Sequence, residues 1–206
     1  MLKPKPLPQQ PASWRAKSAP NFELLAELQA AGYQKIIGID EVGRGALAGP
    51  VIVAAVELNQ RVDGITDSKL LPKAQRQTLA VQIHGLASQI SFGSASVGEI
   101  YELGLSAGLK LAYERALEQI ETDLILTDFV RLPGRKFIAQ PQGDRYFYPT
   151  AAASIVAKVY RDQLMRVYHQ LHPDYGWDTN VGYGTSGHQK ALREFGPTAL
   201  HRITFL

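Results

Sequence analysis

Four acidic residues stand where apolar segments of the sequence end, and their types suit a metal site. Asp40 and Glu41 close the apolar run KIIGID just before Gly43, and Asp128 closes the run DLILTD. Asp144 follows in the segment QGD, ahead of a helical pattern. Carboxylates gathered from several strand ends supply the oxygen ligands that Mg²⁺ and Mn²⁺ prefer, and their mutual repulsion raises their pKa values unless cations lie between them.

Such a site could hydrolyse a phosphodiester without a side-chain nucleophile. Two cations about 3.5–4 Å apart would hold the attacking water and the leaving oxygen. The simpler alternatives are a strand terminus that reaches solvent at Asp40 and Glu41, and an N-terminal helix cap at Asp144. Neighbouring side chains on a regular strand point to opposite faces, so Asp40 and Glu41 converge only if the backbone turns at the glycines that follow.

The segment Gly43–Ala48 also fits the G-x-G-x-x-A pattern of dinucleotide-binding folds. Asp63 lies about 20 residues further on, where such folds place an acid that binds ribose. That function requires a helix directly after Gly45, whereas Pro50 and the run VIVAAV predict a strand. We therefore disfavour an NAD-type oxidoreductase. A P-loop is excluded because no G-K-[ST] follows the glycines.

The same glycines suit close approach of the backbone to a sugar. Gly43 and Gly45 carry no side chain, so backbone groups there can contact a 2′-hydroxyl, the group that distinguishes RNA from DNA. Arg44 lies between them and could hold a phosphate with its bidentate guanidinium.

An α/β fold is expected to position these residues. Apolar, β-branched runs predict strands over 35–40, 51–58, 88–97, 123–128 and 136–140. Helical spacing predicts helices over 22–31, 72–84, 99–120, 151–171 and 187–195. Strands mixed with crossing helices indicate a sheet covered by helices.

Composition limits the classes of protein to which this chain could belong. The 206 residues include 45% hydrophobic and 20% charged residues, enough for a stable core. The chain has no cysteine, which excludes disulfides and thiolate-bound zinc and favours a reducing compartment. A net charge of +3 permits a polyanionic partner without requiring one. Residues 1–20 are proline-rich and predict a disordered tail, followed by one folded domain over 21–206. Without a signal-peptide core or a long apolar span, we expect a cytoplasmic monomer that does not bind membranes.

Several segments, in matching order over about residues 33–205, resemble ribonuclease HII, the type 2 ribonuclease H family. They are IGIDEVGRGALAGPVIVAAV, DSKLL, the strand ending in Asp128, QGD, AAASIVAKVYRD, GYGT and HRITF. The resemblance implies a ribonuclease H-like mixed five-stranded sheet flanked by helices, with a helical C-terminal segment. It also implies an endonuclease that hydrolyses the RNA strand of RNA–DNA hybrids and incises at ribonucleotides embedded in duplex DNA, using Mn²⁺ or Mg²⁺ and leaving 5′-phosphates.

The resemblance also assigns roles to single residues. Asp40, Glu41 and Asp128 would bind the metal ions, and Asp144 would be the fourth catalytic carboxylate. The substrate would be bound by Gly43, Arg44 and Gly45 through the 2′-hydroxyl, by Ser68 and Lys69 at phosphates, and by Tyr183 on the sugar beside the ribonucleotide. Lys158 is a further phosphate candidate. The alternatives are a loop aromatic that covers the core for Tyr183, and ordinary solvation for a lysine on a helix.

Three positions depart from the family pattern. Phe129 follows Asp128 where a glycine is usual, which puts the surroundings of that carboxylate in doubt. Gln142 and Val181 stand where lysines are common, so we expect weaker backbone binding with a flatter salt dependence, and a substrate range that is narrower.

The sequence disfavours two related kinds of protein. Ribonuclease HIII carries a sizeable extra N-terminal domain, for which the sequence ahead of the first strand leaves no room. A non-catalytic hybrid-binding module would lack the carboxylates, and we expect no C-terminal clamp-binding tail.

The histidines are given no catalytic role. His169 and His172 lack a third zinc ligand, so we expect them to be solvated or to cap a helix. His188 and His201 lie in segments near the cleft and have no assigned role.

Overall fold

The computed structural model describes residues 20–128 and 130–206. Except for Pro20, the predicted tail lies outside the described residues, and so does Phe129. The elements are, in order, α1 (Glu23–Ala30), β1 (Ile36–Val42), β2 (Val51–Glu57), α2 (Lys73–Leu86), β3 (Gln89–Ala95), α3 (Val97–Leu103), α4 (Leu105–Glu118), β4 (Leu124–Thr127), β5 (Phe137–Ala139), α5 (Gly143–Tyr146), α6 (Tyr148–Leu171), α7 (Trp177–Asn180) and α8 (Ser186–Phe195), with 3₁₀ turns at Pro173–Tyr175 and Ile203–Phe205.

The strands form one five-stranded sheet in the order β3-β2-β1-β4-β5. β1, β2 and β3 pair antiparallel, whereas β4 pairs parallel with β1 and β5 parallel with β4. The predicted mixed sheet of five strands is therefore confirmed. β1 lies at its centre, between the antiparallel β2 and the parallel β4, and its pairing with β4 ends at Ile39.

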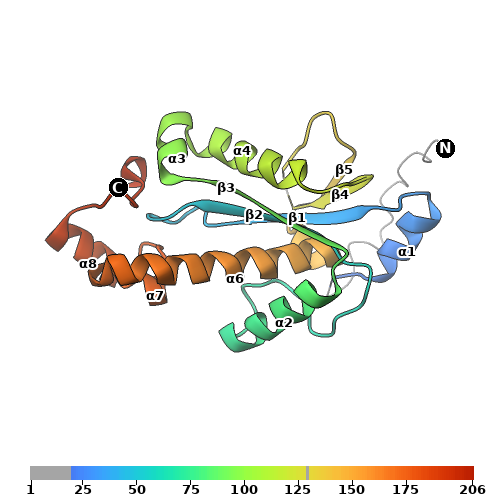
Figure 1. Ribbon diagram of the computed structural model, residues 1–206, viewed down its shortest axis with the longest axis horizontal. Helices are drawn as coiled ribbons and strands as arrows, with labels where there is room; N and C mark the ends of the chain where they lie inside the picture. Colours follow the sequence, from blue (N-terminus) through green and yellow to red (C-terminus); the bar gives the residue numbers. More distant parts are fainter. Residues whose placement is uncertain (1–19, 129) are drawn as a thin grey trace.

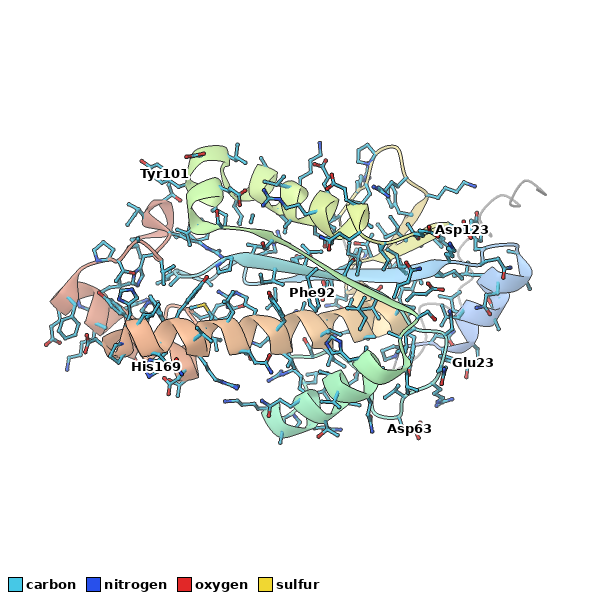
Figure 2. All side chains as sticks on the ribbon, viewed as in Figure 1. Glu23, Asp63, Phe92, Tyr101, Asp123 and His169 are labelled. Carbon is cyan, nitrogen blue, oxygen red and sulfur yellow. The ribbon has the colours of Figure 1, made fainter. Side chains whose placement is uncertain are left out.

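Helices cover both faces of the sheet (Figure 1). The long helix α6 runs along one face with α2 beside it, and α3 and α4 cover the other. Alternate strand residues serve the two faces, as the pleat requires. Ile36 and Ala54 belong to the apolar cluster that includes α6, and Ile37 and Val53 to the cluster that includes α4. Phe92 of β3 stacks on Tyr160 of α6, with ring centroids 4.7 Å apart (Figure 2).

The prediction of a single helix over 99–120 was wrong, because this segment forms two helices, α3 and α4. Ser96 and Glu99 form a capping box that starts α3, and the N–H of Gly104 donates to the Ile100 carbonyl where α3 ends. Gly104 has a φ of 78°, a conformation that glycine adopts at little cost, so the chain turns there before α4 begins. The other predicted helices and strands are present with ends shifted by a few residues.

The C-terminal segment packs as a small third cluster at one end of α6. Its buried members are Ala48, Met165, Tyr175, Trp177 and Ala191. The chain then returns to the loop between β1 and β2, where Ala48 and His201 form an isolated antiparallel bridge. This return places residues that are far apart in the sequence beside each other. No helix in the described part of the chain is long and apolar enough to cross a membrane.

Candidate active site

Two of the predicted carboxylates lie side by side at the carboxyl ends of neighbouring parallel strands. Ile39 of β1 pairs with Thr127 of β4, so the next residues along are Asp40 and Asp128. Residues in register on parallel strands point to the same face, about 4.8 Å apart. Asp40 is 8% exposed and interacts with the hydroxyl of Ser154, which lies on α6. Asp40 therefore faces α6.

The third carboxylate is brought to this pair by a close approach of α5 to β4. The backbone N–H of Gly143 donates to Asp128 Oδ1 over 3.1 Å. A Cβ at Gly143 would lie 2.7 Å from the Thr127 carbonyl oxygen, so only glycine fits there. Asp144 follows directly and is 5% exposed. It lies inside the first turn of α5, whose N-cap is Gln142, so the helix-cap alternative does not describe it.

The fourth carboxylate lies on the opposite face of the sheet. β1 continues through Val42, and Glu41 pairs with Val53 in regular antiparallel register. The backbone turn that would bring Asp40 and Glu41 to one side is therefore absent from β1. Glu41 Oε2 accepts a hydrogen bond from the hydroxyl of Tyr113 on α4 over 2.5 Å, and Oε1 lies 3.1 Å from Arg44 Nη1.

The four carboxylates nevertheless form one electrostatic cluster. Burial raises the pKa of Asp40 well above its ordinary value, and the charges of Glu41 and Asp144 raise it further. Burial, together with the charges of Asp67 and Asp128, raises the pKa of Asp144 to about 6. Crowded, desolvated carboxylates of this kind gain most from a nearby cation.

Lys69 and Asp67 are part of the same cluster. Although burial opposes its charge, the pKa of Lys69 is raised by Asp144, Asp67, Asp40 and Asp128. Lys69, the predicted phosphate contact, is thus electrostatically coupled to four carboxylates of the cluster. Asp67 was not predicted as a site residue; it is 3% exposed and lies 3.4 Å from Arg145 Nε.

Ser68 is placed differently from the prediction. Its side chain is buried, and its hydroxyl lies 2.7 Å from that of Ser154, which in turn interacts with Asp40. A hydroxyl engaged in this way is not at the surface, where a phosphate contact would need it. It supports Asp40 instead. Lys158 is likewise engaged, in a 2.8 Å ion pair with Asp162.

The donor set fits a hard divalent cation, because every side chain in the cluster that could bind one offers oxygen. The candidate ligands do not surround a single point. In the part of the chain that the structure describes, no three His, Cys, Asp or Glu side chains converge closely enough to enclose an ion. Many Mg²⁺ sites use only one or two carboxylates and keep several waters, so this donor set is compatible with that ion.

Comparison with known proteins agrees with this geometry. The family model for ribonuclease HII matches residues 37–206. The ribonuclease HII of Synechococcus sp. (strain JA-3-3Ab) is 43% identical over 194 residues, which cover 90% of this chain and 88% of that protein. The chain belongs to the ribonuclease HII family. Enzymes of this family cleave RNA in RNA–DNA hybrids and at embedded ribonucleotides, and they depend on divalent metal ions.

Solved structures share the fold. The ribonuclease HII of Archaeoglobus fulgidus, solved in a complex with PCNA, has a TM-score of 0.73 at 24% identity over 82% of this chain and 94% of that one. Bst-RNase HIII, solved in complex with Mn²⁺, has a TM-score of 0.54 at 20% identity over 79% of this chain and 63% of that one.

The two glycines of the ribonuclease HII loop have different roles. Gly43 has a φ of 92°, and a Cβ there would lie 2.3 Å from Arg161 Nε, so it is glycine because the guanidinium packs against it. Nothing lies within 4 Å of a Cβ at Gly45, so that position is open. Of the two, only Gly45 has the free space that the predicted sugar contact requires. The loop leads into β2 rather than a helix, which removes the dinucleotide-binding alternative.

Two buried arginines hold this loop against the C-terminal segment. Arg161 donates to the carbonyls of Pro50, Val181 and Ala48 over 2.8–2.9 Å. Arg202 donates to the carbonyls of Gly49 and Arg44 over 2.7–2.9 Å. Burial lowers the pKa of Arg161 and that of Arg202, the latter to about 10. Both arginines lie within segments that resemble the family, but their sequence context did not reveal this role.

Tyr183 lies beside the same loop. The carbonyl of the preceding Gly182 accepts the N–H groups of Leu47 and Ala48 over 2.8 and 3.2 Å. The partly exposed ring of Tyr183 has Lys158 Nζ and Arg161 Cζ each 5.6 Å from its centroid. The structure thus brings the predicted sugar contact and the glycine loop together, although 138 positions separate residues 45 and 183 in the sequence.

His201 and His188 form a chain of hydrogen bonds that ends at the Tyr183 carbonyl. The N–H of Thr198 donates to His201 Nδ1, so neutral His201 carries its proton on Nε2 and donates to His188 Nε2 over 3.0 Å. His188 Nδ1 then donates to the Tyr183 carbonyl over 2.9 Å. His169 instead lies 3.6 Å from Asp178. The His172 ring packs against that of Trp177, with centroids 5.6 Å apart.

Proposed function

We propose that this member of the ribonuclease HII family uses Asp40, Glu41 and Asp128 to bind Mn²⁺ or Mg²⁺, with Asp144 as the fourth catalytic carboxylate. The observation that carries the proposal is the parallel register of β1 and β4, which sets Asp40 and Asp128 side by side with Asp144 electrostatically coupled to both. The Mn²⁺ complex of a ribonuclease HIII with the same fold supports the choice of ion.

Divalent ions bound there would activate water and stabilise charge on the leaving oxygen of a phosphodiester. The protein's own side chains orient the reaction. The hydroxyl of Ser154, itself 2.7 Å from that of Ser68, holds Asp40, and the Gly143 N–H holds Asp128. Without a cation, burial and neighbouring charges raise the pKa of Asp144 to about 6, so this carboxylate gains from a divalent ion nearby. Lys69 neutralises part of the carboxylate charge and would contact a phosphate.

Recognition of the ribonucleotide is assigned to the loop beside these carboxylates. The open backbone at Gly45 is accessible to a 2′-hydroxyl, and the exposed Arg44 can contact a phosphate. Tyr183 would pack on the neighbouring sugar. We assign catalysis to residues 21–206 as one unit, because the C-terminal segment supplies Tyr183 and holds the glycine loop. A cytoplasmic monomer remains our expectation, consistent with a sequence that has no cysteine.

The test uses duplex DNA that carries one ribonucleotide, incubated with Mn²⁺, Mg²⁺ or a chelator. The wild type is expected to incise on the 5′ side of the ribonucleotide only when metal is present. Asp40→Asn should reduce the rate by roughly 10²–10³-fold or more, the scale of one lost electrostatic contact to a transition state, and leave the fold intact.

Asp63→Asn is the matched control, because the Asp63 side chain is 98% exposed and contacts only Arg61 among the ion pairs of the described residues. It is expected to cut like the wild type. Unchanged incision by Asp40→Asn, measured on a preparation with a wild-type circular dichroism spectrum, would contradict the proposed site.

A further inference from the structure

The side chain that holds Glu41 comes from the other side of the sheet. Tyr113 lies on α4 and is fully buried. Its hydroxyl donates to Glu41 Oε2 over 2.5 Å. The rest of the ring lies in the apolar cluster between the sheet and α4, among residues such as Ile39 and Val53. The phenol is therefore apolar except at the one atom that meets the carboxylate.

Glu41 requires a fixed partner at this position. Its side chain is only 8% exposed, and a buried carboxylate without hydrogen bonds is costly. Arg44 contacts Oε1, but the Arg44 side chain is 55% exposed and carries a charge that competes with a cation for the same oxygen. Tyr113 is buried and neutral. It can fix the orientation of the carboxylate without neutralising it.

A structural role alone does not explain the hydroxyl. Phenylalanine would fill the same apolar space and would not bury a polar group, which has a desolvation cost. The geometry is that of an outer partner that orients a metal ligand.

We propose that Tyr113 is a positioning residue that sets the metal affinity of Glu41. It holds Oε2 from the α4 face and leaves Oε1 as the oxygen available to a cation. This inference rests on the proposed function, since it presumes that Glu41 is a ligand. It means that the metal site is built from both faces of the sheet, with Asp40 oriented by Ser154 of α6, Asp128 by the Gly143 N–H of α5 and Glu41 by Tyr113 of α4.

The experiment measures Mn²⁺ binding by isothermal titration calorimetry without nucleic acid. The proteins are the wild type, Tyr113→Phe, Glu41→Gln and Tyr148→Phe. Tyr148 is the matched control, because its buried hydroxyl is also hydrogen-bonded, to the Val62 carbonyl over 2.9 Å, away from the carboxylates. Tyr113→Phe should weaken Mn²⁺ binding roughly 10-fold or more, as the loss of an outer partner of a metal ligand does. Tyr148→Phe should bind like the wild type.

A second readout separates affinity from chemistry. For Tyr113→Phe, raising the Mn²⁺ concentration should restore most of the incision rate, whereas Glu41→Gln should remain slow. In the Glu41→Gln background, Tyr113→Phe should have no further effect on Mn²⁺ affinity, since the two side chains act through one contact. Thermal unfolding of all variants checks that each is folded.

The outcomes distinguish the two proposals. Wild-type Mn²⁺ binding by Glu41→Gln would remove Glu41 from the proposed ligand set. Weakened binding by Glu41→Gln together with wild-type binding by Tyr113→Phe would overturn the positioning role alone. Equal losses in Tyr113→Phe and Tyr148→Phe would also overturn it, because the effect would then follow from the loss of any buried hydroxyl.

Discussion

Val181 has a backbone conformation that its side chain disfavours. Its φ is 45° and its ψ is 35°, the left-handed region in which a β-branched residue is rare. Gln142, with a φ of 61°, is the other residue of the described chain that is not glycine and has a positive φ. Both precede a glycine of a site loop, and the resemblance to ribonuclease HII led us to expect a lysine at each position. The Val181 carbonyl accepts a 2.8 Å hydrogen bond from Arg161, which helps to hold the conformation.

Replacing Val181 should relieve this strain. A residue other than glycine in a sparsely populated region costs about 1–3 kcal/mol. Val181→Asn removes the branched Cβ, so we expect the free energy of unfolding in urea to rise by about 0.5–1 kcal/mol, since some apolar contact with the C-terminal cluster is lost. An unfolding free energy equal to or below that of the wild type would show that the conformation is not strained.

Val181→Lys separates strain from charge. If the lysine meets a phosphate, the logarithm of the affinity for an RNA–DNA hybrid should fall more steeply with the logarithm of the salt concentration, by about 0.7–0.9. Binding is measured in the Asp40→Asn background so that the hybrid is not cut. Val181→Asn should leave this slope unchanged.

Among the elements, the contact between β1 and α6 determines where Asp40 lies. A Cβ at Gly38 would lie 2.0 Å from Pro149 C and Thr150 N, so the helix rests directly on the strand at this point. Asp40 is two residues further along β1, and Ser154 is one turn further along α6. The close approach therefore brings the serine hydroxyl within reach of the carboxylate.

Gly38→Ala should be strongly destabilising, by about 3 kcal/mol or more, because backbone atoms on both sides would have to move. The matched control is Gly85→Ala on α2, where nothing lies within 4 Å of the added Cβ. It should stabilise the protein by up to about 1 kcal/mol, since alanine favours a helix. Denaturant unfolding measures both changes. Equal stability of the two variants would mean that β1 and α6 are not packed as described.

For the molecule as a whole, the return of the chain to the sheet completes the site. Arg161 and Arg202 donate to backbone carbonyls from positions 44 to 50 and 181, and the paired His188 and His201 lie beneath Tyr183. None of these hydrogen bonds is made to a carboxylate. The four side chains stabilise the junction only while the arginines are charged and the histidines are neutral.

Acid should weaken this junction. Burial lowers the pKa of His201 from its ordinary value of 6.5 to about 4, and burial lowers that of His188 as well. As the pH falls below 6.5 the unfolded chain takes up protons that the folded chain excludes, so stability that is present above 6.5 is lost toward pH 4. Asp40 and Asp144, whose pKa values are raised, change the stability in the opposite direction, so the test is the difference between two proteins. Between pH 7.5 and 5, the unfolding free energy of the wild type should fall more, or rise less, than that of His201→Asn. The same change in both proteins would contradict a neutral histidine pair.

Residue patterns alone predicted the candidate ligand types and most elements of this protein. Apolar runs predicted the five strands, and the carboxylates at their ends predicted oxygen ligands for a divalent cation. The resemblance to ribonuclease HII supplied the family, which the comparisons confirm. Periodicity missed the break at Gly104, because one glycine with a positive φ ends a helix without interrupting the apolar spacing.

Which of these residues meet depends on how the elements pack. The register of β1 with β4 aligns Asp40 with Asp128, and the continuing pleat sends Glu41 to the opposite face. Tyr113 marks an apolar turn of a helix in the sequence, and no local signal shows that its hydroxyl reaches a carboxylate 72 residues away. Such contacts depend on the packing of distant elements, which residue spacing along the chain does not encode.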